Sequence, residues 1–469
     1  MDMEKKSRKI KLSQCMIVKN EDKNIRRALS WGKGIVCEQI VVDTGSTDRT
    51  VEIAEEMGAK VYHFTWCDDF SAAKNYAIEQ ASGDWIVFLD ADEYFDEDSA
   101  SKLIPIIAIA EDMSRAGRQI NAVRSRLINL GENAVVGVVA HQDRVFRNKP
   151  NLRYVNRIHE GLRLSGKQNY GYFDASEELM ILHTGYTMEA YKETGKRERN
   201  ISMLQKELEE NPRNTAVLAY LGDAYMAENQ LDQAKKYFQR AVSCGMEAKD
   251  RRENIDLHTL RSIGLLLILY AKESDPRHEE EVRELHRQYR ELYSAYPDGD
   301  CYFGAWLYQN KKYEEGRKYL ESALDKMKRY KGDIPLYMNA SLKLVYAQLA
   351  DCCRHMGRQQ ETVRNCVLSL GVDKYYTEPL IMLLGLLRAE RGEKASAEGT
   401  WQLLSKLYDL TVFKDQMAVF KGAKLTGFKA LEQRVYDVMP PLQRRAVQEA
   451  LEKKIEEMKA REKSTKNTD

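Results

Sequence analysis

The chain has 469 residues, a length that suggests about three structural units. Its 73 lysines and arginines nearly balance its 72 aspartates and glutamates, and the formal net charge of +1 argues against a dedicated nucleic-acid-binding protein, which needs a cationic face to displace counterions from phosphates. A content of 43% apolar and 31% charged residues excludes a chain that is disordered throughout.

Three features of the sequence bear on its compartment. It contains no uninterrupted apolar run of about 18 residues, which a transmembrane helix requires. The charged stretch from Met1 to Lys11 lacks the apolar segment of a secretory signal. The eight cysteines form no Cys-x-x-Cys pair, which indicates reduced thiols in place of a disulfide framework or a zinc site. The sequence therefore predicts a cytoplasmic protein.

Short apolar runs alternate with helical patterns in the first part of the chain. Residues 12–18 are predicted to form a buried strand, followed by a helix in which apolar side chains recur four residues apart. A second strand covers residues 39–43 and ends in Asp43, and the helix after it ends at Gly58. The pattern indicates two successive strand–helix units.

A third strand is predicted for residues 60–64 and a fourth for residues 85–89, with a helix between them that begins near Phe70. Strand–helix alternation with continuous apolar strands is typical of a parallel sheet covered on both faces. Ligands of such sheets bind beyond the carboxyl ends of the strands. Asp43, Asp90 and Asp92 all follow strands, so we expect them at the same edge of the sheet.

From about Thr187 onward the pattern is almost entirely helical, and it contains an internal repeat. Small residues recur at relative positions 0 and +12, with two further core positions at +16 and +19. The four sets are Gly222, Ala234, Phe238 and Ala241; Gly304, Gly316, Leu320 and Ala323; Ala350, Thr362, Cys366 and Ser369; and Gly385, Ala397, Trp401 and Leu404. Small residues at the first two positions let two antiparallel helices approach closely, and the unit resembles the tetratricopeptide repeat of about 34 residues. A further degenerate helix pair is expected between Leu257 and Tyr296.

Asp90 and Asp92 are the strongest candidates for chemistry. Two carboxylates one residue apart can converge on one hard divalent cation, which can bridge the phosphates of a nucleotide. An isolated Asp-x-Asp is common in solvated turns. Here it directly follows a buried strand and is expected beside a second strand-end acid, Asp43, which favours a binding site.

Three stretches of the sequence resemble family 2 glycosyltransferases, whose catalytic domain has the GT-A nucleotide-diphosphosugar fold. They are Cys15–Glu21, Val41–Thr50 and Phe88–Glu93. The resemblance covers roughly residues 10–190. Tetratricopeptide repeats after such a domain resemble a bacterial subgroup that includes the sublancin-type peptide S-glycosyltransferases. The resemblance implies an α/β domain with a mixed, mostly parallel sheet, followed by an all-α tetratricopeptide-like solenoid.

The resemblance also implies roles on the donor side. Asp43 stands in a motif with Ser46. It matches the acid that accepts a hydrogen bond from the nucleotide base, usually uracil N3–H. The alternative for Asp43 is an N-terminal cap of the next helix. Asp92 matches the direct metal ligand, and Asp90 matches the acid that reaches the ribose and the water shell of the metal. Mg²⁺ and Mn²⁺ both suit these oxygen ligands. The metal would stabilise the charge on the departing diphosphate.

Two further donor-side candidates lie near the third predicted helix. Lys74, followed by Asn75, resembles the basic–Asn pair of the family and is a candidate to steady a phosphate, with an exposed helical lysine as the alternative. Trp66 is a candidate to line the pocket for the sugar donor, with an ordinary core aromatic as the alternative.

The acceptor side is predicted from two later motifs, Tyr154–Glu160 and Leu182–Tyr186, which resemble motifs of the same subgroup. An inverting transfer needs a base that takes the proton of the acceptor. Glu160 is the first candidate and Asp143 the second, and the alternative for Glu160 is a surface salt bridge. His183 is a candidate third metal ligand, with a hydrogen-bonded structural histidine as the alternative.

We expect a GT-A domain at residues 10–186, a connecting helix at 187–210, tetratricopeptide-like repeats at 211–405, a C-terminal helical cap at 406–450 and a charged tail at 451–469. Because the catalytic domain is short, the helical part is expected to complete the acceptor side. The repeats would present a face to the acceptor or to a partner, and copies of the chain could associate through them.

The function predicted from these features is metal-dependent, inverting transfer of a single sugar from a nucleoside-diphosphate sugar, in the first place a UDP-sugar, to a peptide or protein side chain. The sequence lacks the Gln-x-x-Arg-Trp motif of processive members of the family, which argues against polymer synthesis. Three alternatives remain open: transfer to a lipid-linked or envelope glycan, an inactive repeat scaffold, and a sugar nucleotidyltransferase, for which Lys19–Glu21 is a poor phosphate-binding loop.

Overall fold

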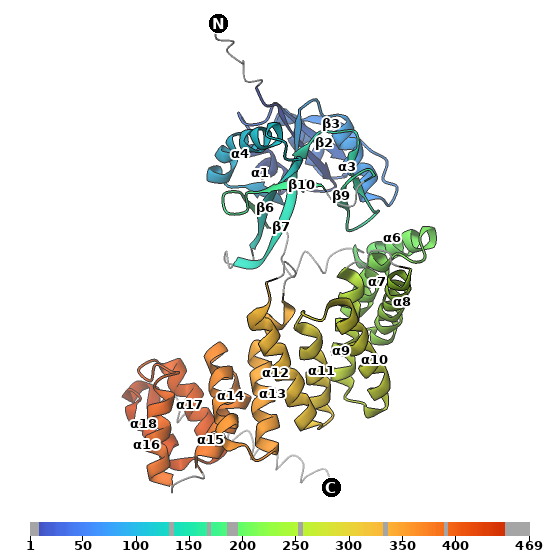
Figure 1. Ribbon diagram of the computed structural model, residues 1–469. Helices are drawn as coiled ribbons and strands as arrows, with labels where there is room; N and C mark the ends of the chain where they lie inside the picture. The colour runs from blue at the N-terminus through green and yellow to red at the C-terminus, as the bar shows by residue number, and fades with distance from the viewer. Residues whose placement is uncertain are drawn as a thin grey trace, which may run out of the picture. The chain divides into compact units, whose positions relative to one another are not determined.

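The computed structural model describes residues 9–130, 136–166, 170–184, 196–251, 257–331, 336–388 and 393–445 (Figure 1). The chain divides into two compact units, Met1–Ala224 and Tyr225–Asp469. Gly185 and Tyr186 of the second acceptor-side motif, residues 187–195 of the predicted connecting helix and the predicted tail at 451–469 lie outside the described residues.

The first four strands confirm the predicted alternation. They are β1 (Leu12–Val18), β2 (Glu38–Asp43), β3 (Lys60–His63) and β4 (Trp85–Phe88). They lie in the order β3-β2-β1-β4 and all pair in parallel. The helices between them are α1 (Ile25–Ser30), α2 (Thr50–Glu56) and α3 (Phe70–Glu79).

The sheet continues with strands of mixed direction, to a total of nine within the described residues. β4 pairs antiparallel with β7 (Val136–Arg147), and β7 pairs antiparallel with β6 (Ile120–Leu130). β11 (Met180–His183) lies parallel to β6 and antiparallel to β5 (Glu93–Phe95), and β10 (Gly171–Asp174) also pairs with β6. β8 (Leu152–Val155) and β9 (Gly161–Leu164) form a separate two-stranded sheet. The predicted mixed, mostly parallel sheet is confirmed.

Alternate residues of β4 pack on opposite faces of the sheet, which explains its continuous apolar run. Trp85 and Val87 belong to the core beneath α4 (Glu97–Arg115), whereas Ile86 and Phe88 belong to the core that contains Ala77 and Ile78 of α3. All four β4 side chains are fully buried. Apolar side chains on both faces of a strand are shielded from water only when both faces of the sheet are covered.

The carboxyl ends of β1, β2 and β4 meet at one edge of the sheet. In the parallel register Val18 pairs with Asp43, and Cys15 pairs with Phe88, two residues before Asp90. Asp43 and Asp90 therefore flank the end of β1, as expected from the sequence. Gly45, in the left-handed region with φ of 107°, turns the chain directly after Asp43.

Helices make up the rest of the described chain. They are α6 (Lys196–Glu210), α7 (Thr215–Ala227), α8 (Leu231–Asp250), α9 (Leu257–Glu273), α10 (Glu279–Tyr293), α11 (Asp298–Gln309), α12 (Tyr313–Arg329), α13 (Leu342–His355), α14 (Gln359–Val372), α15 (Thr377–Arg388), α16 (Glu393–Leu404), α17 (Phe413–Thr426) and α18 (Lys429–Val438). In each of the four repeat sets, positions 0 and +12 fall on consecutive helices. The helix pair expected between Leu257 and Tyr296 is α9 and α10. Within the described ranges, each helix is too short or too polar to cross a membrane.

The close helix approach predicted from the small residues is present at Gly304 of α11. A Cβ atom there would lie 2.9 Å from Cγ of Leu320 in α12, whereas at the equivalent Gly385 no described atom lies within 4 Å of such a Cβ. We expect Gly304→Ala to lower the free energy of unfolding by about 1–3 kcal/mol through overpacking. Gly385→Ala should raise it by up to about 1 kcal/mol through helix propensity. Urea unfolding followed by circular dichroism measures both, and equal effects would contradict the predicted packing.

Candidate functional site

A cavity of about 900 Å³ opens at the edge of the sheet where β1, β2 and β4 end. Its walls come from seven separate segments of the chain, and the lining side chains include six of the nine residues predicted as site residues. These six are Trp66, Lys74, Asp90, Asp92, Glu160 and His183. Asp43, Ser46 and Asp143 are not among the lining residues, although Thr44, next to Asp43, is.

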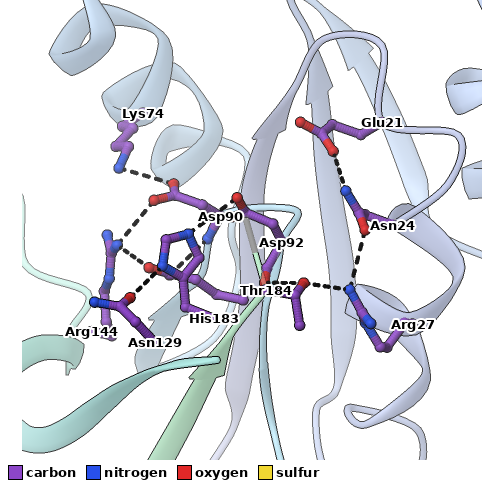
Figure 2. Close-up of polar contacts among 11 residues, drawn as sticks. Glu21, Asn24, Arg27, Lys74, Asp90, Asp92, Asn129, Arg144, His183 and Thr184 are labelled. Atoms are coloured by element: carbon purple, nitrogen blue, oxygen red, sulfur yellow. Dashed lines mark hydrogen bonds and ion pairs between the residues drawn. The ribbon is translucent and has the colours of Figure 1, made fainter. Parts of the chain in front are cut away.

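Lys74 lines the cavity and forms ion pairs with two acids. Its Nζ lies 3.2 Å from Oδ1 of Asp90 (Figure 2) and 2.6 Å from Oε1 of Glu160. The side chain is only 2% exposed, so the alternative of an exposed helical lysine is wrong. The aromatic rings of Phe88 and Tyr154 lie 5.1 and 5.3 Å from Nζ. Because the ammonium group already contacts two carboxylates, we infer that Lys74 positions Asp90 and Glu160.

Arg144 of β7 approaches Asp90 from the other side. Its Nη2 donates to Oδ2 of Asp90 at 2.9 Å and to Oε1 of Glu93 at 2.6 Å. Glu93 is buried, and its other oxygen accepts the backbone N–H of Asp90 at 3.0 Å. Asp90 is thus held between two cations, with its backbone fixed as well.

The charges in this cluster shift one another's protonation. Burial by itself would raise the pKa of Asp90, but the charges of Lys74 and Arg144 hold the pKa of that carboxyl well below its usual range. Burial raises the pKa of Glu93, although Arg144 acts in the opposite direction. Burial disfavours the charged form of Lys74, and Asp90 and Glu160 more than compensate, so the pKa of Lys74 lies above its usual value.

Asp92 lies beside His183, the other residue predicted from the sequence as a candidate metal ligand (Figure 2). Nε2 of His183 is 3.2 Å from Oδ2 of Asp92, and Nδ1 is 2.7 Å from Oδ1 of Asn129 on β6. The hydrogen bond with Asp92 raises the pKa of His183 above its usual value, against the effect of burial. Asn129 fixes the orientation of the imidazole ring, which is the usual task of the partner of a ligating histidine.

The spacing of Asp92 and His183 fits a divalent cation. Two neighbouring ligands of an octahedral ion, each at about 2.1 Å, lie about 3 Å apart, close to the observed 3.2 Å. Within the described residues, no group of three or more His, Cys, Asp or Glu side chains is arranged to hold a metal ion. Asp90, which sequence reasoning counted as a ligand, instead faces Lys74 and Arg144.

A second set of contacts fixes the backbone of Asp92 (Figure 2). Its carbonyl oxygen accepts the backbone N–H of Thr184 at 3.1 Å and the hydroxyl of Thr184 at 3.2 Å. Arg27 of α1 donates to the same hydroxyl oxygen at 2.6 Å and to Asn24, which in turn donates to Glu21 of the cavity wall. The end of β11 is therefore tied to the loop that carries Asp92.

Asp43 organises the turn that follows β2. Its carboxylate accepts the backbone N–H of Ser46 at 2.9 Å and of Gly45 at 3.2 Å, and Nδ1 of His63 lies 3.4 Å away. Burial would raise the pKa of Asp43, but these contacts and the Ser46 side chain lower it. Because α2 begins only at Thr50, with Arg49 in the N-cap position, Asp43 does not cap that helix. Ser46 also accepts the backbone N–H of Asn20 at 3.0 Å.

The loop that carries Glu160 is clamped to α3. Asn75 donates to the carbonyl oxygen of Tyr154 at 2.9 Å and accepts its N–H at 3.0 Å, and Ser71 donates to the carbonyl oxygen of Asn156 at 2.6 Å. Asn156 and His159 adopt left-handed backbone conformations with φ of 75° and 53°. Glu160 is 18% exposed and pairs with a buried lysine, so it is not a surface salt bridge. The Lys–Asn pair recognised in the sequence thus positions the predicted base.

The structure does not bring Asp143 to the cavity. Nε and Nη2 of Arg124 donate to its two oxygens at 2.9 and 3.0 Å, and the hydroxyl of Tyr170 donates to Oδ2 at 2.9 Å. Both oxygens are therefore already hydrogen-bonded. Trp66, by contrast, is half-buried in the cavity wall, where its indole N–H donates to Asp68 and its ring meets Phe70 edge-on.

Sequence reasoning missed three residues that hold the site together: Glu93, Arg144 and Asn129. Glu93 ends the Phe88–Glu93 motif and Arg144 directly follows Asp143, so both stand next to residues that the sequence singled out. Asn129 carried none, because only the parallel pairing of β11 with β6 places it beside His183.

Two family models match the chain. Residues 13–171 match glycosyl transferase family 2, and residues 193–247 match a tetratricopeptide repeat. The N-terminal part of the chain is therefore a family 2 glycosyltransferase domain with the GT-A fold, and tetratricopeptide repeats follow it. Both predictions from the sequence are confirmed.

Among curated proteins, the chain is 34% identical over 242 residues to a TPR repeat-containing protein of Synechococcus elongatus, covering 50% of this chain and 57% of the relative. It is 28% identical over 246 residues to the SPbeta prophage-derived glycosyltransferase SunS of Bacillus subtilis, covering 51% and 55%. The chain thus spans about half the length of the curated relatives that it matches.

Solved structures match weakly. S. aureus TarS 1-349 in complex with UDP-GlcNAc has a TM-score of 0.33 and 15% identity, over 65% of this chain and 92% of that chain. Glucosyl-3-phosphoglycerate synthase from Mycobacterium tuberculosis, with Mn²⁺ and UDP among its ligands, has a TM-score of 0.21 and 25% identity, over 25% and 44%.

Proposed function

We propose that this protein is a metal-dependent, inverting glycosyltransferase that moves a single sugar from a UDP-sugar to a side chain of a peptide or protein. The observation that carries the proposal is the pair of Asp92 and His183 beside the cavity at the carboxyl edge of a GT-A sheet. The family 2 domain supports sugar transfer, and the tetratricopeptide repeats support a protein or peptide acceptor.

Asp92 and His183 would hold Mg²⁺ or Mn²⁺, and when bound the ion would offset negative charge on the diphosphate. Asp43 and Ser46 would contact the nucleotide base, since their turn lies beside Thr44 of the cavity wall. Trp66 would line the pocket for the sugar. Asp90 would have a positioning role. Its ion pairs with Lys74 and Arg144 fix the loop that carries Asp92.

Glu160 is the better candidate for the base. It lines the cavity, and Lys74 holds its carboxylate in place, whereas Asp143 points to Arg124 and Tyr170 outside the lining. A base on the acceptor side takes the proton of the attacking hydroxyl or thiol as the sugar is transferred with inversion.

The direct test is a thermal-shift screen of nucleotide sugars with and without Mn²⁺. A donor that binds the native state raises the melting temperature by mass action. We expect UDP-sugars to stabilise the protein more with Mn²⁺ than without. Incubation with a labelled donor, followed by separation of peptide and lipid fractions, then identifies the acceptor class. Label in the lipid fraction alone would contradict the peptide acceptor.

We expect Glu160→Gln to separate hydroxyl from thiol acceptors. Transfer to a serine peptide should fall by about 10²–10⁴-fold, which is the usual contribution of a positioned base. Transfer to the matched cysteine peptide near pH 8.5 should largely persist, because a thiol with a pKa of about 8.5 is then half ionised. Rates with the two peptides measure the difference, and Glu177→Gln, at an 83% exposed side chain, is the control. Equal losses with both peptides would argue against Glu160 as the base.

A further inference from the structure

Helix α6 packs against two walls of the cavity although it lies outside the residues matched by the family 2 model. Lys206 pairs with Asp68 at 2.5 Å, between the lining residues Trp66 and Phe70. Glu207 accepts the backbone N–H of Arg157 at 3.0 Å, three residues before Glu160, and Glu210 forms an ion pair with the Arg157 side chain. α6 is thereby anchored to two segments that carry lining residues, the one with Trp66 and Phe70 and the one with Glu160.

From this helix, Arg199 reaches the lining of the cavity. Its guanidinium carbon lies 5.3 Å from the centre of the Phe70 ring, and the ring of Trp66 meets Phe70 at 4.9 Å. Nη2 donates to Asn200 at 3.3 Å, whereas Nε is buried without a hydrogen-bond partner. No carboxylate of the described residues lies within ion-pair distance of Arg199. A half-buried guanidinium with spare donors is suited to an anionic ligand.

The charges around the cavity show which ligand Arg199 would take. Lys74 and Arg144 are neutralised by Asp90, Glu93 and Glu160, so they offer little positive charge to a substrate. Arg199 and the exposed Lys19 are the lining cations for which the described part of the chain shows no ion pair. A nucleotide-sugar donor brings a diphosphate with negative charge that must be matched.

We propose that Arg199 binds the diphosphate of the donor, so that helix α6, which follows the family 2 domain in the chain, completes the donor site. This inference rests on the proposed function. The planar guanidinium can donate two parallel hydrogen bonds to phosphate oxygens, which an ammonium group cannot. The contact places part of the donor site outside the GT-A domain. Donor binding would then depend on the contacts that hold α6 against Asp68 and Arg157.

The test is calorimetric titration of the full-length protein with UDP and with uridine, both in the presence of Mn²⁺. We expect Arg199→Met, which keeps an unbranched side chain over Phe70, to weaken UDP binding about tenfold to a hundredfold and to leave uridine binding unchanged. Arg199→Lys should show an intermediate loss. Arg197→Met removes the same charge from an exposed position two residues earlier on α6 and should bind UDP like the wild type.

The possible failures can be told apart. Wild-type affinity for UDP in both Arg199 variants would overturn the role of Arg199 while leaving the proposed function intact, and so would a defect that appears only in the KM for the acceptor. A wild-type protein that binds no UDP would overturn the proposed donor and this inference together. Melting temperatures of the free variants show whether each is folded. If Arg199→Met is unfolded, the comparison of Arg199→Lys with Arg197→Met decides.

Discussion

Replacing Asp92 with Asn is expected to reduce glycosyl transfer by about 10³-fold or more. The substitution keeps the shape of the side chain but removes the charged oxygen that lies 3.2 Å from Nε2 of His183. A cation bound there supplies several kcal/mol of charge stabilisation, and each 1.36 kcal/mol corresponds to a tenfold change in rate. Donor turnover as a function of Mn²⁺ concentration measures the effect, and the variant should need far more metal for half-maximal activity.

Asp98→Asn is the matched control for this experiment. Asp98 stands in the first turn of α4, with a side chain that is 68% exposed and paired with Lys102. Its replacement should leave turnover and metal dependence unchanged. Equal turnover in the wild type and Asp92→Asn, at all metal concentrations, would remove the proposed metal site and leave only the repeats with a proposed role.

Replacing Lys74 with Met is expected to lower the free energy of unfolding by about 3–5 kcal/mol, because removing one partner of a buried ion pair leaves an uncompensated charge. Two carboxylates depend on this lysine: Asp90 at 3.2 Å and Glu160 at 2.6 Å. Methionine has nearly the volume of the lysine stem, so loss of packing contributes little. Urea unfolding measures the change, and transfer activity should also be lost as the two acids separate.

Two comparisons make the Lys74 result interpretable. Lys102→Met removes a lysine that is 42% exposed from an i,i+4 pair on α4 and should change stability by no more than about 0.5 kcal/mol. Adding Glu160→Gln to Lys74→Met should recover part of the lost stability, because one unpaired charge disappears with it. If Lys74→Met were as stable as the wild type, the ammonium group could not be the link between Asp90 and Glu160.

Much of the site could be predicted from local sequence because several candidate site residues lie directly after the ends of strands. The apolar run of β4 is buried on both faces, and this is visible in the sequence as four consecutive large apolar residues. A chain that leaves such a strand must emerge at the carboxyl edge of the sheet, where Asp90 and Asp92 then stand. The role of Lys74 was not predictable in the same way. Its residue type suggested a phosphate contact, but only the packed structure shows that its ammonium group is buried.

The sequence by itself determined the two-part architecture, the strands that lead to Asp43 and Asp90, and the spacing of the helical repeats, because these depend on periodicity within a few turns or strands. Only the tertiary structure decided the partner of each acid. Arg144 reaches Asp90 across 54 residues and His183 reaches Asp92 across 91. The pairing of β4 with β7 and of β11 with β5 brings these residues together in space although they are far apart in the sequence. The registers of these pairs depend on packing between distant segments, which no local pattern encodes.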